Sequence, residues 1–363
     1  MKTEVLATDP RNVLRQSVLA AVEALRRGEI VALPTETVYG LAADAANEAA
    51  VAAIFEAKER PRFDPLIVHL ARREDLERVA CLPEEVAAEC RKLVQAFWPG
   101  PLTLVLPKTG AVGDLITAGL CTVAVRMSAH RVFRQVVEDF GSPLAAPSAN
   151  RFGRISPTSA AAVLEELEGR IPLLLDGGAC PEGLESTIVR VAPALKRGKP
   201  EIRILRAGPV TPEDLKPFGK VVLCQRESRA EPGAPGQLPG HYAPRTPLRL
   251  LEIPEDFTPV PGRRYALLSL RGAPEDGYVG LADFEVVVAL SPGSGKLREA
   301  AVRFFHVLRH LDAAGVDEIL AEPIPERGLG VAIMERLRRA AAATRGPEWG
   351  STIEKPEGGL SQG

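Results

Sequence analysis

Short apolar runs alternate with amphipathic segments through the first part of the chain, and this alternation constrains the fold more than any other feature. Residues 66–70, 102–106 and 122–126 are apolar runs of strand length, whereas residues 11–27 place apolar side chains at helical spacing. Further strands are expected at 30–33, 143–146, 173–176, 186–191 and 202–206, and further helices at 48–59, 84–97, 130–140 and 158–167. Because strands and helices follow one another irregularly, we expect an open α/β sheet with mixed strand directions.

The composition of the sequence changes after about residue 211. Residues 226–247 are rich in proline and glycine, which is typical of a linker. A second α/β pattern follows, with strands expected at 248–251, 265–268, 286–290 and 318–321 and helices at 296–314 and 328–343. The expected domains are therefore a large α/β domain at 10–213, a linker or flap at 214–246, a smaller α/β domain at 247–345 and a disordered tail at 346–363.

The overall composition limits the classes of function. The formal net charge is −2, whereas proteins that bind nucleic acid tightly on their own usually have a strong basic excess. No run approaches the ~20 apolar residues of a membrane span, and no signal peptide is visible. The five cysteines form no CxxC pair. We therefore expect a cytoplasmic protein with free thiols and no membrane partner.

Residues 34–40, with the sequence PTETVYG, are a first candidate for chemistry. They follow an expected buried strand and carry hydroxyls, a carboxylate and a phenol. Loops at strand ends are where open α/β sheets bind ligands. An ordinary connection to a helix, capped by Thr and Glu, is the alternative.

A second candidate is the cationic loop with Lys58, Arg60 and Arg62, which leads into the strand that carries His69. Three cations on a proline-stiffened loop suit a polyphosphate. Cations near the end of a helix are also favourable for electrostatic reasons alone, so a structural role stays open. A single histidine in an apolar strand is more often a core residue than a ligand.

Arg126 ends an otherwise apolar strand and needs an anionic partner. That partner is either a ligand carboxylate, which matches the guanidinium fork, or a structural Asp or Glu. Weaker candidates are the small and polar segments 145–150, 156–158, 176–178, 185–189 and 206–208. The chain contains no GxxxxGK[ST], GxSxG, HExxH or GxGxxG motif, so a P-loop enzyme is excluded at the level of motifs.

Taken in order, eight segments resemble one family. PTETVYGL, the KxRP loop, FWPGPLTLVL, VAVRMSAH, PLAAPSAN, SPT, STIVRV and LRAG are similar to the YrdC-like threonylcarbamoyl-AMP synthases. The proline-rich linker with HYAP and the second α/β domain resemble the long, two-domain form of that family. The resemblance covers about residues 10–345. It implies a YrdC-like open mixed sheet, followed by the linker and a smaller Rossmann-like domain.

The resemblance also implies a reaction. L-Threonine, bicarbonate and ATP would give threonylcarbamoyl-adenylate and pyrophosphate, and a separate transferase would use the adenylate for the t6A modification of tRNA. Mg²⁺ would accompany ATP and be bound mainly through the phosphates, with no protein ligand assigned. Direct contact with tRNA stays open.

The resemblance assigns roles to residues of this chain. Lys58 and Arg60 would clamp the phosphates. Threonine would be held by Thr37, His69, Arg126, Ala146 and Ser186. ATP would be held by Arg60, Asp64, Thr122, Ser148, Ser156, Arg206 and Tyr242. Catalysis would then depend on position and charge rather than on a covalent intermediate.

The chain departs from the family pattern at two places. Asp64 stands where asparagine is common, and its carboxylate could repel phosphate or help to hold a metal. The linker before HYAP lacks the usual basic residues, although His241 and Tyr242 are present. We expect this linker to form a flap over the nucleotide.

Two alternative functions remain at this level. One is an RNA-binding module of the same fold, in which Arg60, Arg62 and Arg126 would contact phosphates. The other is the carbamoyl transfer of similar domains in hydrogenase maturation, which is disfavoured because those domains accompany zinc fingers and this chain has no CxxC.

Overall fold

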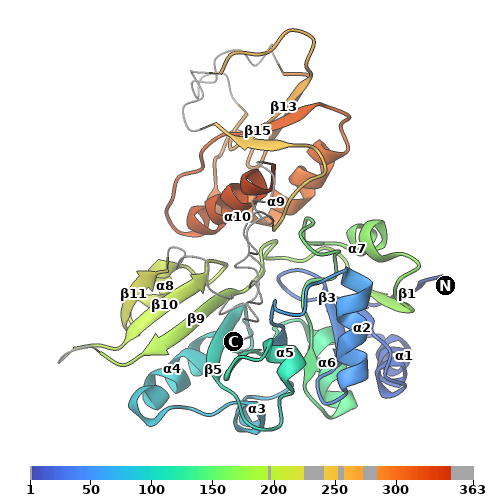
Figure 1. The fold of residues 1–363 in the computed structure, drawn as a ribbon, viewed down its shortest axis with the longest axis vertical. Helices are drawn as coiled ribbons and strands as arrows, with labels where there is room; N and C mark the ends of the chain where they lie inside the picture. Colours follow the sequence, from blue (N-terminus) through green and yellow to red (C-terminus); the bar gives the residue numbers. More distant parts are fainter. Residues whose placement is uncertain (1, 195–197, 225–240, 252–256, 273–283, 345–363) are drawn as a thin grey trace, which may run out of the picture.

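The computed structural model describes residues 2–194, 198–224, 241–251, 257–272 and 284–344, which form two α/β units (Figure 1). The larger unit is built on an 11-stranded sheet with the strand order β1-β8-β2-β3-β7-β4-β6-β5-β9-β10-β11. The smaller unit is built on a 4-stranded sheet with the order β12-β15-β13-β14. Residues 225–240 of the expected linker (214–246) and the expected tail 346–363 lie outside the described residues.

The large sheet mixes parallel and antiparallel pairs. Its strands are β1 (Glu4–Ala7), β2 (Val31–Leu33), β3 (Gly40–Asp44), β4 (Ile67–His69), β5 (Leu102–Pro107), β6 (Thr122–Arg126), β7 (Leu144–Ala145), β8 (Leu173–Asp176), β9 (Thr187–Ala192), β10 (Glu201–Arg206) and β11 (Lys220–Leu223). The pairs β4–β6, β5–β9 and β10–β11 are parallel, whereas β2–β3, β5–β6 and β9–β10 are antiparallel. The prediction of a mixed α/β sheet is confirmed.

Helices cover both faces of the central strands. They are α1 (Arg15–Arg26), α2 (Glu48–Lys58), α3 (Leu76–Val79), α4 (Ala87–Phe97), α5 (Asp114–Thr117), α6 (Arg131–Phe140), α7 (Ala160–Leu167) and α8 (Pro212–Leu215), with the 3₁₀ turns η1 (Arg73–Asp75) and η2 (Glu84–Val86). Successive residues of β2 alternate between two hydrophobic clusters. Val31 and Leu33 pack with α1 and α6, whereas Ala32 joins the cluster on the other face. Both faces of the central sheet are therefore buried, as the continuous apolar runs require.

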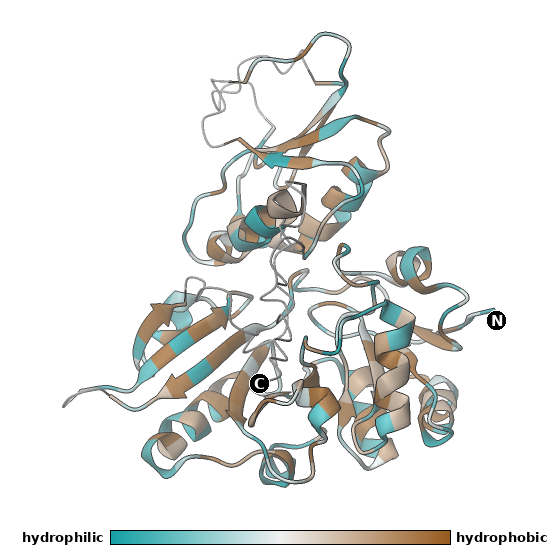
Figure 2. Cartoon of the chain, in the orientation of Figure 1, coloured by the Kyte–Doolittle hydropathy of each residue, from teal (hydrophilic) through white to brown (hydrophobic). Residues whose placement is uncertain are grey.

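The hydropathy of the strands changes toward the edge of the sheet formed by β10 and β11. Figure 2 shows the central strands as mostly hydrophobic, whereas β9 and β10 alternate between hydrophobic and hydrophilic residues. In β10, Ile202, Ile204 and Arg206 are buried and the residues between them are half-buried. This part of the sheet is therefore packed mainly on one face.

The smaller unit contains β12 (Leu248–Leu250), β13 (Tyr265–Ser269), β14 (Val286–Ala289) and β15 (Glu318–Ala321), with α9 (Leu297–Asp312) and α10 (Leu329–Thr344). All its strand pairs are parallel. In Figure 1, α9 and α10 lie between this sheet and the larger unit. One cluster of buried residues includes Phe304 and Phe305 of α9 together with Tyr242 and the core of the larger unit.

The structure differs from the sequence prediction at three strands. β1 and β11 pair into the large sheet although they lie outside the expected domain 10–213. Both are edge strands of four residues, EVLA and KVVL, whose side chains are exposed or half-buried, and such short runs show no period that marks a strand. β3 begins at Gly40, the last residue of PTETVYG, and was not expected, because its sequence GLAAD lacks the β-branched and aromatic residues that indicate a strand.

Candidate active site

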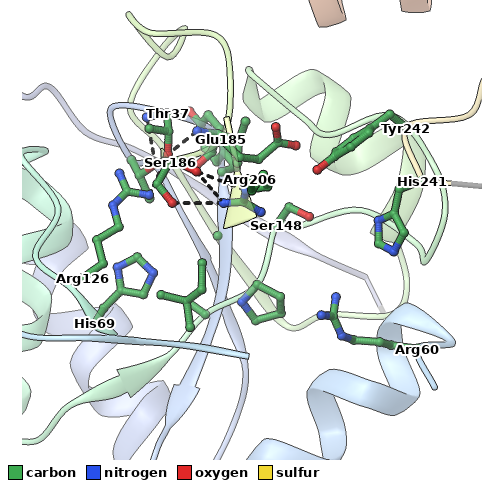
Figure 3. A pocket seen from close by; sticks show the side chains of 17 residues that line it. Thr37, Arg60, His69, Arg126, Ser148, Glu185, Ser186, Arg206, His241 and Tyr242 are labelled. Atoms are coloured by element: carbon green, nitrogen blue, oxygen red, sulfur yellow. Dashed lines mark hydrogen bonds between the residues drawn. The ribbon is translucent and has the colours of Figure 1, made fainter. Parts of the chain in front are cut away.

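A polar pocket lies where the loop before β3, the ends of β4 and β6, and the segment that enters β9 meet (Figure 3). The lining brings together nine residues expected from the sequence: Thr37, Arg60, His69, Arg126, Ala146, Ser148, Ser186, Arg206 and Tyr242. β4 and β6 run parallel, and His69 pairs in register with Arg126. In Figure 3, Arg126, His69 and Thr37 lie at one end of the pocket, and Arg60, His241 and Tyr242 lie at the other.

Arg126 forms the centre of the first end. Its side chain is buried, and Nη1 donates a hydrogen bond of 2.9 Å to Oγ1 of Thr37. Nη2 lies 2.6 Å from Oε1 of Glu36. The Nε–H of Arg126 is buried without a hydrogen-bond partner among the described residues. A buried donor without a partner is unfavourable, so binding an acceptor in the pocket at this nitrogen would lower the free energy of the site.

Glu36 is the structural carboxylate that pairs with Arg126. Burial alone would raise its pKa, but the charge of Arg126 and hydrogen bonds, including one from Ser128, hold the pKa below its usual value. Glu36 is therefore ionised at neutral pH and occupies one side of the guanidinium. Of the five N–H groups of an arginine, the contacts with Glu36 and Thr37 engage two, so donors remain for a ligand.

His69 lies beside Arg126 and is neutral. Its ring packs against Phe133 with the centroids 4.7 Å apart. Burial and the nearby charge of Arg126 lower its pKa to about 3. At neutral pH the imidazole therefore adds no charge, and its Nδ1 is buried without a hydrogen-bond partner among the described residues, whereas the backbone of Ala146 engages the ring as well.

Ser186 and Arg206 are joined in the middle of the pocket. Arg206 donates to both the carbonyl oxygen and the hydroxyl of Ser186, with the Nη2 distances both 3.0 Å. Thr103 on β5 shares a 2.8 Å hydrogen bond with the same hydroxyl. The side chains of the β5, β9 and β10 region therefore hold one another in place before any ligand binds.

Arg60 is fixed at the opposite end by the loop that follows α2. It donates to the carbonyl oxygens of Asp64 and Pro65 at 3.1 and 2.8 Å, and Nη2 lies 2.8 Å from the Asp64 carboxylate. Nε2 of His241 lies 3.7 Å from the same carboxylate. Burial and the charge of Arg60 keep the pKa of His241 well below its usual value. Asp64 thus balances the charge of Arg60 from beneath the pocket instead of lining it.

The arrangement can be compared with known proteins. A family model described as telomere recombination matches residues 23–208, and a model described as the C-terminal domain of threonylcarbamoyl-AMP synthase matches residues 210–342. The threonylcarbamoyl-AMP synthase of Pyrococcus abyssi is 42% identical over 324 residues, which cover 87% of this chain and 92% of the relative. The synthase of Bacillus subtilis is 38% identical, with 94% and 98% covered.

The chain belongs to the threonylcarbamoyl-AMP synthase family. A crystal structure of Pyrococcus abyssi Sua5 complexed with L-threonine superposes with a TM-score of 0.80 at 36% identity, and the match covers 94% of this chain and 98% of that one. The predicted family and two-domain architecture are confirmed. The C-terminal family model begins at residue 210, before β11, although β11 completes the large sheet.

Four of the residues to which the resemblance assigns roles in this family are not in the pocket lining: Lys58, Asp64, Thr122 and Ser156. Thr122 begins β6 and Arg126 ends it, so about 13 Å of strand separates them. Lys58 and Ser156 lie behind residues that line the pocket. Ser156 donates a hydrogen bond to Glu185, which is itself in the lining. The roles expected for these residues stay predictions.

Lys58 supports the loop that carries Ser148. It is fully buried, and Nζ donates to the carbonyl oxygen of Ser148 at 2.6 Å and to that of Asn150. Burial and the charge of Arg60 lower its pKa well below the ordinary value. In this arrangement Lys58 holds the loop from below, so its geometry favours a supporting role over a direct contact with phosphate.

Sequence reasoning missed two partners of the pocket. Glu36 lies within the PTETVYG segment but was not singled out as the partner of Arg126. Glu185 contacts Arg336, which lies on α10 of the smaller unit. The first could have been suspected from its place beside Thr37. The second has no local signal, because Arg336 is one of several arginines on an amphipathic helix.

Within the described ranges, no helix is both long and apolar enough to cross a membrane. In the same part of the chain, His, Cys, Asp and Glu side chains form no group of three or more that could hold a metal ion.

Proposed function

We propose that this chain condenses L-threonine, bicarbonate and ATP into threonylcarbamoyl-adenylate and pyrophosphate, as the first step of the t6A modification of tRNA. Family membership supports this activity, and relatives at 38 and 42% identity carry the name threonylcarbamoyl-AMP synthase. The observation that carries the proposal is the buried Arg126, which keeps an unpaired Nε–H beside the neutral His69 in a pocket that also contains Arg60 and Arg206.

Threonine would bind at the Arg126 end. Its carboxylate would accept hydrogen bonds from the guanidinium donors that Glu36 and Thr37 leave free. The neutral His69 would bind a polar group of the substrate without repelling its ammonium group. The Pyrococcus abyssi structure that is similar over most of the chain is a complex with L-threonine, which supports threonine as the substrate.

ATP would bind toward the other end of the pocket. Arg60 supplies positive charge there and Arg206 supplies it from the middle of the pocket, while Ser148 and Tyr242 supply hydroxyl groups. Both arginines are buried, so their attraction for a phosphate is screened less than it would be in water. Burial lowers the pKa of both, although arginine stays charged at neutral pH.

The proposed reaction has two steps. The threonine amine attacks the carbon of bicarbonate, water leaves, and an N-carboxylate forms. One oxygen of this carboxylate then attacks the α-phosphorus of ATP, and the bond to pyrophosphate breaks. Both reactants of the second step are anions, so the arginines at the two ends would lower the barrier by neutralising charge and holding the groups in line.

Mg²⁺ is expected with ATP, but the pocket does not provide a carboxylate cluster for it. Among the described residues that line the pocket, Glu185 is the one with a carboxylate, and it already accepts hydrogen bonds from Ser156 and Arg336. A metal that accompanies ATP would therefore take its oxygens from the phosphates and from water. No step proposed for the side chains of this protein depends on an ion held by the protein.

An RNA-binding function is less well supported by the same residues. Only 8% of Arg60 and 4% of Arg126 are exposed, so neither can reach the backbone of a bulky RNA. Arg62 is exposed and is the member of this group that remains accessible. We propose that the adenylate passes to a separate threonylcarbamoyl transferase, which binds the tRNA.

Pyrophosphate release tests the proposal. Purified full-length protein should release pyrophosphate from ATP only when L-threonine and bicarbonate are both present, and serine should replace threonine poorly. Pyrophosphate release when L-threonine or bicarbonate is left out, or salt-sensitive RNA binding without any turnover, would favour a different function.

A further inference from the structure

One arginine of the smaller unit contacts three parts of the pocket wall. Arg336 lies on α10 and is completely buried. Its Nε and Nη2 donate to Oε2 of Glu185 at 3.2 and 3.1 Å, and its Nη1 donates to the carbonyl oxygen of Ala207. Its guanidinium also lies 5.4 Å from the centroid of the Tyr242 ring. Glu185 and Tyr242 line the pocket, and Ala207 follows Arg206, which lines it as well.

Such burial is unfavourable for a residue that only joins two units. Removing two charges from water costs about as much free energy as a well-formed pair recovers, and apolar residues often serve equally well. Arg309 on α9 offers a comparison. It pairs with Glu166 at 3.3 Å across the same two units, but neither residue lines the pocket.

Tyr242 needs external support for its conformation. Its φ of 65° lies in the left-handed region, which is uncommon for a residue other than glycine. Such a backbone persists where surrounding contacts determine it. Arg336 packs over the ring, and Phe305 of α9 lies with its ring centroid 5.7 Å away. Both of these contacts come from the smaller unit.

The adjoining segment is held by the same helix. Glu335 accepts a hydrogen bond of 2.7 Å from the amide of Ala207, while Arg336 binds its carbonyl oxygen. The next residue, Gly208, lies so close to the segment entering β9 that a Cβ would be 2.5 Å from the carbonyl oxygen of Glu185. The position of α10 is therefore transmitted to the segment that carries Ser186, just before β9, and to β10, which ends at Arg206.

We propose that Arg336 is a positioning residue of the active site, through which the C-terminal domain orients Glu185 and Tyr242 for the nucleotide. This inference rests on the proposed function, because it assigns the nucleotide to the Tyr242 end of the pocket. The C-terminal domain is then part of the ATP site, although threonine binds at the Arg126 end without it.

The test compares full-length variants by calorimetry and by pyrophosphate release. Arg336→Met should weaken ATP binding by about tenfold or more and raise the KM for ATP, while the affinity for threonine stays within about twofold. Arg336→Lys should recover part of the loss, since it keeps the charge but not the fork. The control, Arg309→Met, should lower the melting temperature but leave both affinities within about twofold.

If Arg336→Met does not fold, the double variant Arg336→Met with Glu185→Gln is measured in its place, since it leaves no buried carboxylate unpaired. The reference for this double variant is Glu185→Gln alone. A folded Arg336 variant that binds ATP as its reference does would overturn the inference, and so would an equal loss of threonine affinity. Wild-type protein that binds ATP and threonine but releases no pyrophosphate would overturn only the proposed function. Wild-type protein that does not bind ATP would overturn both.

Discussion

Arg126 offers the sharpest test of how the pocket binds its substrate. Replacing it by alanine removes the donors that we assign to the threonine carboxylate. The single variant also leaves Glu36 as a buried, unpaired carboxylate, which costs about 3–5 kcal/mol of folding stability. The informative variant is therefore Arg126→Ala in a Glu36→Gln background, with Glu36→Gln alone as its reference.

The magnitude follows from the geometry. Two charge-assisted hydrogen bonds to a carboxylate contribute about 1.5 kcal/mol each at the lower limit, so their loss is about 3 kcal/mol. Since 1.4 kcal/mol is a factor of ten, the Kd for threonine should rise by about 150-fold. ATP should bind nearly as before, because Arg60, Arg206 and Tyr242 lie outside the Arg126 end of the pocket.

Calorimetry of each ligand separately provides the measurement. Threonine affinity that stays within about threefold of the Glu36→Gln reference would refute the assignment of the carboxylate to Arg126. An equal loss of ATP affinity would show instead that the substitution disturbs the whole pocket. Thermal unfolding of each variant identifies a loss of fold.

Three further predictions concern stability and turnover. Lys58→Met leaves two loop carbonyls without their donor, so it should lower the free energy of unfolding in urea titrations by about 2–4 kcal/mol and raise the KM for ATP. An unchanged free energy of unfolding would contradict the supporting role of Lys58. The pKa of His69 is about 3 in the folded protein and about 6.5 in the unfolded chain, so the unfolded state binds more protons between these values, and the free energy of unfolding falls by up to about 1.4 kcal/mol per pH unit as the pH is lowered through that window. The variant His69→Asn should therefore lose less stability than the wild type between pH 7 and pH 4. Gly208→Ala should lower the melting temperature and abolish turnover, because its Cβ would meet backbone atoms at 2.5 Å, whereas Gly110→Ala, with no atom within 4 Å, should behave as wild type.

The central part of the fold could be predicted because its elements are buried in a periodic way. The runs that form β5, β6 and β8 were placed correctly, and their apolar residues are buried in the large sheet. The edge strands β1 and β11 were missed because EVLA and KVVL are four-residue runs, too short to show a period, and their side chains stay exposed or half-buried. β3 was missed because its sequence, GLAAD, consists mostly of small residues, and its burial is due to the neighbouring strands that cover it.

The site was predictable to the extent that polar residues stand where apolar ones are expected. Arg126 at the end of an apolar strand demanded a partner, and both of the alternatives remain meaningful. Glu36 is the structural partner, while Nε is left for a ligand. The order of Lys58 and Arg60 within one loop did not indicate that Lys58 would face the carbonyls of another loop while Arg60 lines the pocket.

The sequence by itself determined the family, the mixed α/β class and most residues of the pocket, because these follow from local patterns of polarity and from ordered motifs. Only the tertiary structure decided which charges meet. Arg336 lies 151 residues after Glu185, and no local preference joins them. Their pairing arises because both are excluded from water at the same contact between two domains, where each charge is stable only beside the other.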